Sequence, residues 1–165
     1  MIGALRPFGR STRILSNRCA QCAITSSSRT ASTLVVSEPS PPGGDSSLPP
    51  PTLSAISAAS RFGDPITLLM IGTPSDPAVE PSALPGEVSS VVKADIEGGE
   101  HAHLLPENVA LAIKVAIEAG DGGGEGYARV VAAHTKFGSS YMPRIGAMLD
   151  VAPVPDVVEI LDDGE

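Results

Sequence analysis

Residues 127–149 read YARVVAAHTKFGSSYMPRIGAML, and this stretch decides the fold. Residues Tyr127–Ala133 are an apolar run of strand length, and residues Tyr141–Leu149 carry apolar side chains at helical spacing. A short turn containing Gly138 joins them. A buried strand that leads through such a turn into a helix is the repeating unit of α/β folds. The stretch therefore predicts one strand and one helix of a mostly parallel sheet covered by helices.

The rest of the chain repeats this alternation upstream and ends on one more strand. Runs rich in β-branched residues predict four further strands: Thr33–Ser37, Ile66–Ile71, Val88–Ala94 and Asp156–Ile160. Helical spacing predicts a helix over Leu53–Arg61, capped by Thr52, and a helix over Pro106–Glu118. The remaining stretches are predicted connections: the proline-rich residues 38–51 and 72–87, the charged residues 95–105 and the glycine-rich residues 120–126.

The turn of residues 135–140 offers the one pattern that points to ligand chemistry. Backbone N–H groups at a helix start can hold a phosphate, and Lys136 adds a positive charge. Lys136, Ser139 and Ser140, with His134 beside them, are therefore candidates for a weak anion site. The alternative is that Ser139 or Ser140 simply caps the helix, as helices of this kind require. No nucleophile–base pair or paired carboxylates accompany the turn, so we expect no catalytic residues.

The charges are divided unevenly along the chain. Residues 1–30 hold five of the eleven basic residues and none of the nineteen acidic ones, the first of which is Glu38. Spaced arginines and many hydroxyls without acids are typical of a mitochondrial transit peptide. We therefore expect residues 1–32 to be a disordered transit peptide and residues 33–165 to form one α/β domain. A disordered basic tail is the alternative reading of the first segment.

The acidic remainder excludes two classes of partner. A net charge of −8, more negative still without residues 1–30, repels nucleic-acid backbones and anionic membranes. The longest apolar runs have the length of a strand, so we expect no membrane insertion.

Metal chemistry is also not indicated. Cys19 and Cys22 have the spacing of half a zinc site, but they lie in the expected transit segment and no other cysteine exists. His101 and His103 stand on a polar connection without a third ligand nearby in sequence. We predict no metal site.

Residues 132–157, AAHTKFGSSYMPRIGAMLDVAPVPDV, resemble the α subunits of electron transfer flavoproteins. Those subunits carry a Phe-Gly turn, a Leu-Pro-Arg-like helix start and an apolar Val-Ala-Pro-x-x-Asp-Ile/Val run, in this order and at this spacing. Residues 33–38 resemble the opening strand of the family and residues 52–63 its first helix. The similarity covers about residues 33–160 and is weakest over 72–105.

The resemblance implies a nucleotide-hydrolase-like, Rossmann-like N-terminal domain in three layers. It implies a subunit of the mitochondrial matrix that pairs with a β subunit. In the family, this heterodimer carries electrons from acyl-CoA dehydrogenases, in fatty-acid β-oxidation and amino-acid catabolism, to a quinone reductase. Such a subunit is an electron carrier, not an enzyme.

The family holds FAD mainly in a C-terminal domain of the α subunit, for which no matching positions follow here. We therefore expect an N-terminal part only, incomplete at its C-terminus, that binds no FAD alone. The comparable turn of the family's β subunit belongs to an AMP site that α subunits do not use, so Lys136, Ser139 and Ser140 are expected to be vestigial. A stand-alone nucleotide-binding domain of the universal-stress type and a nonfunctional fragment remain the alternatives.

Overall fold

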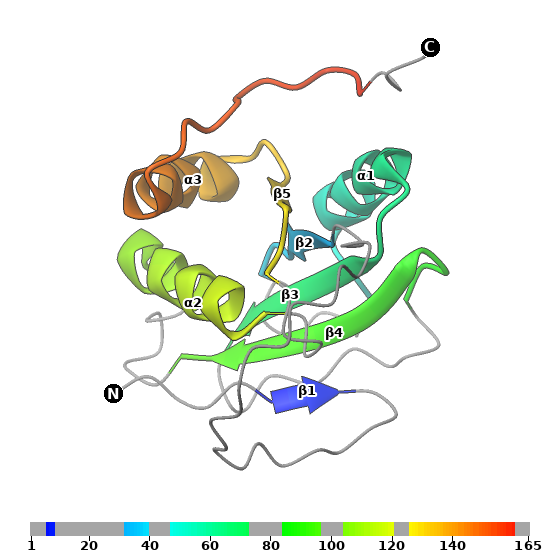
Figure 1. The fold of residues 1–165 in the computed structure, drawn as a ribbon, viewed down its shortest axis with the longest axis horizontal. Coiled ribbons are helices and arrows are strands. Elements are labelled where there is room, and N and C mark those ends of the chain that lie inside the picture. Colours follow the sequence, from blue (N-terminus) through cyan, green and yellow to red (C-terminus); the bar gives the residue numbers. More distant parts are fainter. Residues whose placement is uncertain are drawn as a thin grey trace, which may run out of the picture.

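The computed structural model describes residues 6–8, 32–39, 47–72, 84–96, 104–120 and 126–160. Within these residues, the chain forms five strands and three α-helices, and each α-helix follows a strand (Figure 1). The elements in order are β1 (Arg6–Phe8), β2 (Thr33–Val36), α1 (Pro50–Ala59), the 3-10 turn η1 (Ser60–Phe62), β3 (Ile66–Gly72), β4 (Val88–Asp95), α2 (Pro106–Ala119), β5 (Arg129–Ala132) and α3 (Lys136–Leu149).

The strands form one sheet with the order β1-β4-β3-β2-β5. The four strands from β2 onward are parallel, with Val35 of β2 opposite both Leu68 of β3 and Val131 of β5. Strand β1 pairs antiparallel with β4. The predicted mostly parallel α/β architecture is therefore confirmed.

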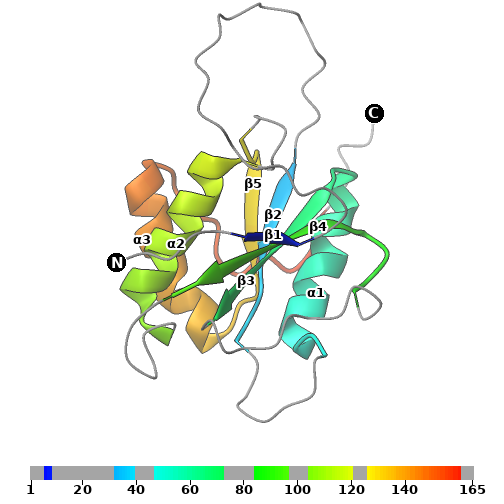
Figure 2. The same cartoon turned by 90° about the horizontal axis from the view of Figure 1, so that it is seen from below.

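Helices cover both faces of the sheet, because successive side chains of a strand point to opposite faces. Val35 and Leu68 pack with Ile56 and Ala59 of α1 on one face. Leu34 and its neighbours on the other face pack against α2 and α3 in a second cluster. Figure 2 shows α1 on one side of the strands and α2 with α3 on the other. The result is the expected three-layer, Rossmann-like arrangement.

The first helix begins earlier than the sequence indicated. Residues 38–51 were expected to exclude helix, yet α1 starts at Pro50, with Pro49 in the capping position. Prolines are tolerated in a first turn because the N–H groups they lack have no partner there. Thr52, the predicted cap, is instead a fully buried residue inside α1.

The predicted last strand, Asp156–Ile160, is wrong. Residues 151–160 follow α3 without joining the sheet. Asp156 has a φ of 54°, in the left-handed region, which no regular strand accommodates. Pro153 and Pro155 precede it and lack the N–H groups that a ladder requires.

Part of the N-terminal segment differs from the expectation of disorder. Arg6–Phe8 form β1 and pair with Lys93, Val92 and Val91 of β4. An edge strand offers unpaired N–H and C=O groups along its outer side, which explains how a short segment can add there. The remaining predicted connections at 73–83, 97–103 and 121–125 lie outside the described residues, as do Cys19, Cys22, His101 and His103.

Candidate functional site

The candidate site lies where the chain reverses its direction across the sheet. Strands β2 and β5 are neighbours, but α1, which follows β2, covers one face and α3, which follows β5, covers the other. In open parallel sheets, ligands bind at such a switch point, beyond the carboxyl ends of the two strands. Here these ends carry Ser37 and Glu38 after β2, and His134 and Thr135 after β5.

Helix α3 starts at Lys136 and is capped by Thr135. The Thr135 backbone is extended, and its hydroxyl oxygen accepts a hydrogen bond from the Gly138 N–H at 3.0 Å. The predicted helix start at Tyr141, with Ser139 or Ser140 as cap, is therefore wrong by five residues. Both serines lie inside the first turns of the helix.

Gly138 lets this helix start sit directly on the end of β5. A Cβ atom at this position would lie 2.1 Å from the carbonyl oxygen of Ala133. No side chain fits at that distance, so the helix and the strand end can approach each other this closely only through glycine. The position is buried.

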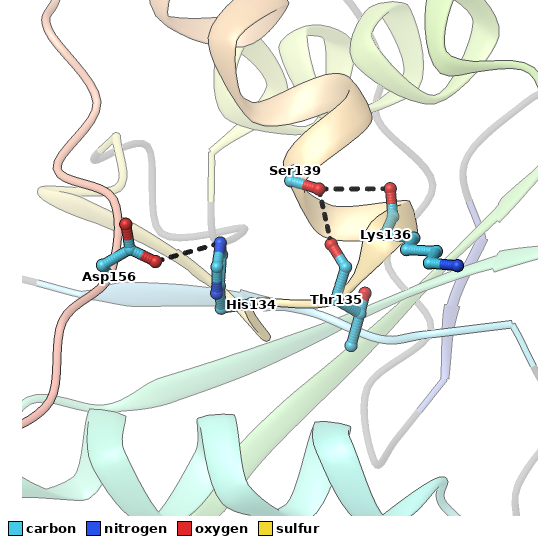
Figure 3. Close-up of polar contacts among 5 residues, drawn as sticks. All are labelled: His134, Thr135, Lys136, Ser139 and Asp156. Carbon is cyan, nitrogen blue, oxygen red and sulfur yellow. Dashed lines mark hydrogen bonds and ion pairs between the residues drawn. The ribbon is translucent and has the colours of Figure 1, made fainter.

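The predicted anion-site residues do not converge on a common point. The Ser139 hydroxyl donates to the backbone carbonyls of Thr135 at 2.7 Å and Lys136 at 3.3 Å, and the Ser140 hydroxyl donates to the Phe137 carbonyl at 2.6 Å. Figure 3 shows the Lys136 side chain extending away from Ser139. These hydroxyls are used within the helix.

A carboxylate that the sequence reasoning did not single out stands at the helix start instead. The Thr135 hydroxyl donates to Oε1 of Glu38 at 2.5 Å, so the same oxygen accepts from Gly138 and donates to Glu38. The Glu38 N–H donates to the Thr52 hydroxyl at 3.0 Å. A negative charge is favourable near a helix N-terminus, where the dipole is positive. The one sequence signal for Glu38 was its place as first acid, directly after the first strand of the domain.

Tyr141 lies one turn further along α3 and is buried, with 1% of its surface exposed. Burial raises the pKa of its phenol above the ordinary value, and the Glu38 carboxylate raises it further. The phenol therefore stays protonated at neutral pH, as a core residue. Its ring meets the ring of Phe137 edge to face, at 5.2 Å between centroids, which fixes the first turns of α3 on the core.

His134 contacts the segment after α3. Its Nε2 lies 3.2 Å from Oδ1 of Asp156 (Figure 3), and both side chains are mostly exposed. Residues 151–160 thus run from the end of α3 back to the end of β5. His134 and Lys136 are sequence neighbours of Thr135, but their side chains take no part in its hydrogen bonds to Glu38 and Gly138.

Arg144 lies past the middle of α3, whereas a helix starting at Tyr141, as predicted, would have placed it in the first turn. Its Nη2 lies 2.8 Å from Oε1 of Glu107 in the first turn of α2. The ion pair links the two helices that share one face of the sheet.

Two kinds of feature are absent among the residues that the structure describes. No helix among them is long and apolar enough to cross a bilayer. No three of their His, Cys, Asp and Glu side chains gather as a metal ion would require.

Comparison with known proteins gives a consistent result. Residues 41–165 match the family described as "Electron transfer flavoprotein domain". The chain is 32% identical over 164 residues to "Electron transfer flavoprotein subunit alpha, mitochondrial" of Arabidopsis thaliana, covering 95% of the chain and 42% of the relative. It is 34% identical over 110 residues to "Electron transfer flavoprotein subunit alpha" of Pseudomonas aeruginosa, covering 67% of the chain and 33% of the relative. It is 33% identical over 137 residues to "Probable electron transfer flavoprotein subunit alpha, mitochondrial" of Caenorhabditis elegans, covering 83% and 38%. The chain thus spans well under half the length of the curated relatives that it matches.

Proposed function

This chain belongs to the electron transfer flavoprotein family, and we propose that it serves as an α-subunit part of an electron carrier that pairs with a β subunit. The observation that carries the proposal is the family match over residues 41–165, together with relatives that are named α subunits. The three-layer parallel fold agrees with this assignment. The chain spans 42% of the length of the Arabidopsis relative. The activity of a whole subunit is therefore proposed for this chain and does not follow from the match alone.

In the heterodimer, electrons pass from acyl-CoA dehydrogenases of fatty-acid and amino-acid catabolism to a quinone reductase. The role proposed for this chain is to carry the α-subunit surface that meets the β subunit. Co-expression of the full chain with a β subunit, with affinity tags on each partner in turn, tests this role. We expect a 1:1 complex by size-exclusion chromatography with light scattering. A folded chain that stays free of β with either tag would contradict the proposal.

The proposed location is the mitochondrial matrix. It is supported by the acid-free, arginine-bearing residues 1–30 and by the Arabidopsis and C. elegans relatives, whose names describe them as mitochondrial. We expect import to cleave the chain between Arg29 and Thr33. N-terminal sequencing of the imported protein checks this prediction. A mature start beyond Leu34 would contradict it, because Thr33 and Leu34 are fully buried in β2.

We further propose that the chain by itself binds no FAD. The start of α3, the switch-point turn that resembles a phosphate-binding turn, has the Gly138 N–H and the Thr135 hydroxyl engaged by protein groups. Titration of FAD into the purified full chain, followed by flavin fluorescence, tests this expectation. Stoichiometric quenching at micromolar FAD would overturn it. AMP or ATP retained through purification, detected by mass spectrometry, would instead favour the universal-stress type of nucleotide-binding domain.

A further inference from the structure

Glu38 lies beside the start of α3, where its carboxylate accepts a hydrogen bond from the Thr135 hydroxyl. We propose that this carboxylate takes the place of a bound anion at the switch point and thereby excludes phosphate groups, which makes Glu38 the specificity-determining residue of this helix start. The inference goes beyond the proposed electron-carrier function and does not depend on pairing with a β subunit.

Hydrogen bonds at the start of α3 include the Glu38 carboxylate. Thr135 joins Glu38 to Gly138 through one hydroxyl, with distances of 2.5 Å to the carboxylate and 3.0 Å from the N–H. The Thr135 hydroxyl therefore donates its hydrogen bond to Glu38 of the same chain and not to a ligand. A charge-assisted hydrogen bond of this kind is shorter and stronger than one between neutral groups.

The backbone of Glu38 is also held in place by hydrogen bonds. Its N–H donates to the Thr52 hydroxyl, which is fully buried in α1, and its carbonyl accepts from the Ser37 hydroxyl at 3.0 Å. The Thr52 and Ser37 hydroxyl oxygens lie 3.5 Å apart. The backbone after β2 is thus fixed between α1 and α3, which aims the carboxylate at the helix start.

Electrostatics also favours a carboxylate at this place. The first turn of α3 carries no acid of its own, so Glu38 supplies the negative charge that the helix N-terminus favours. Burial and, after it, the same carboxylate raise the pKa of Tyr141, one turn further along α3. A phosphate approaching this point would meet a like charge.

Thermal unfolding of the full chain in inorganic phosphate, against chloride at equal ionic strength, tests the proposal. The variants are Glu38→Ala, which empties the position, and Glu38→Gln, which removes the charge but keeps an oxygen for Thr135. Glu118→Ala is the matched control, because it removes one exposed acid that is paired with Lys114 on α2. Chemical shifts of the Gly138 and Ser139 amides report where phosphate acts.

We expect wild type and Glu118→Ala to gain the same small amount in phosphate over chloride, because phosphate stabilises folded proteins in general by exclusion from their surface. Glu38→Ala should gain roughly 3–6 °C more than these two at a tenfold excess of phosphate over the dissociation constant. The two amides should shift in the same titration. A merely structural Glu38 would lower stability equally in both salts, and that result in a folded Glu38→Ala would overturn the proposal.

Two other results are also decisive. If Glu38→Ala does not fold, Glu38→Gln should show a smaller phosphate-specific rise, and no rise would overturn the proposal. Shifts of the Gly138 and Ser139 amides of the wild-type chain in the phosphate titration would overturn it as well, because the position would then accept phosphate with Glu38 present.

Discussion

Helix α2 begins with Pro106 and carries an acid of its own, Glu107, in its first turn, whereas α3 has no acid in its first turn. The negative charge at the start of α3 comes from Glu38, through a hydrogen bond that joins residues 97 positions apart. The start of α2 therefore depends on residues that are adjacent in sequence, whereas the start of α3 depends on the packing of β2 beside β5. A helix start that depends on tertiary contacts is expected to respond more strongly to substitution.

The largest effect is expected from Gly138→Ala at the start of α3. The added methyl group would meet the Ala133 carbonyl oxygen at 2.1 Å, and this oxygen belongs to the backbone, so it cannot move aside as a flexible side chain could. We expect a loss of about 3 kcal/mol in the free energy of unfolding, measured by urea denaturation. Gly86→Ala is the control, because its Cβ would have open space. Equal stability of the two variants would mean that α3 does not sit against β5 as described.

A smaller effect is expected from Thr135→Ala. This change removes both the cap of the Gly138 N–H and the donor to Glu38, so we expect a loss of about 1–2 kcal/mol. Thr135→Ser keeps the hydroxyl and should recover most of the loss in the same urea measurement. If serine is as destabilising as alanine, the two hydrogen bonds are not what stabilises this helix start.

The smallest effect is expected from Arg144→Ala, which breaks the ion pair between α3 and the first turn of α2. Both side chains are 44% exposed or more, and exposed pairs contribute only about 0.2–1 kcal/mol. A double-mutant cycle with Glu107→Ala measures the coupling, which should shrink in high salt. A coupling well above this range would show that the pair is structurally as important as the Thr135 cap.

The same contrast explains which boundaries the sequence predicted well. The start of α2 at Pro106 and the strands near Thr33, Ile66 and Val88 were placed within a residue or two. Each is marked by adjacent residues: a proline in a first turn or a compact run of β-branched side chains. The start of α3 was placed five residues late, because a buried glycine and a threonine cap inside an apparent Gly/Ser turn look like loop residues.

The residues of the candidate site show the same contrast between local sequence patterns and tertiary contacts. The sequence located the turn after β5 but selected Lys136, Ser139 and Ser140, whose side chains do not converge. It marked Glu38 only as the first acid of the chain, because no local pattern links a residue after the first strand to a helix start 97 residues later.

The amino-acid sequence by itself determined the α/β class, the alternation of strands and helices and the family, because hydrophobic periodicity and motif spacing are properties of neighbouring residues. Only the tertiary structure decided that β2 lies beside β5, that Glu38 therefore reaches Thr135, and that residues 156–160 stay out of the sheet. These outcomes depend on which strand ends become neighbours in space and on the left-handed backbone at Asp156, and neither is encoded in a local pattern.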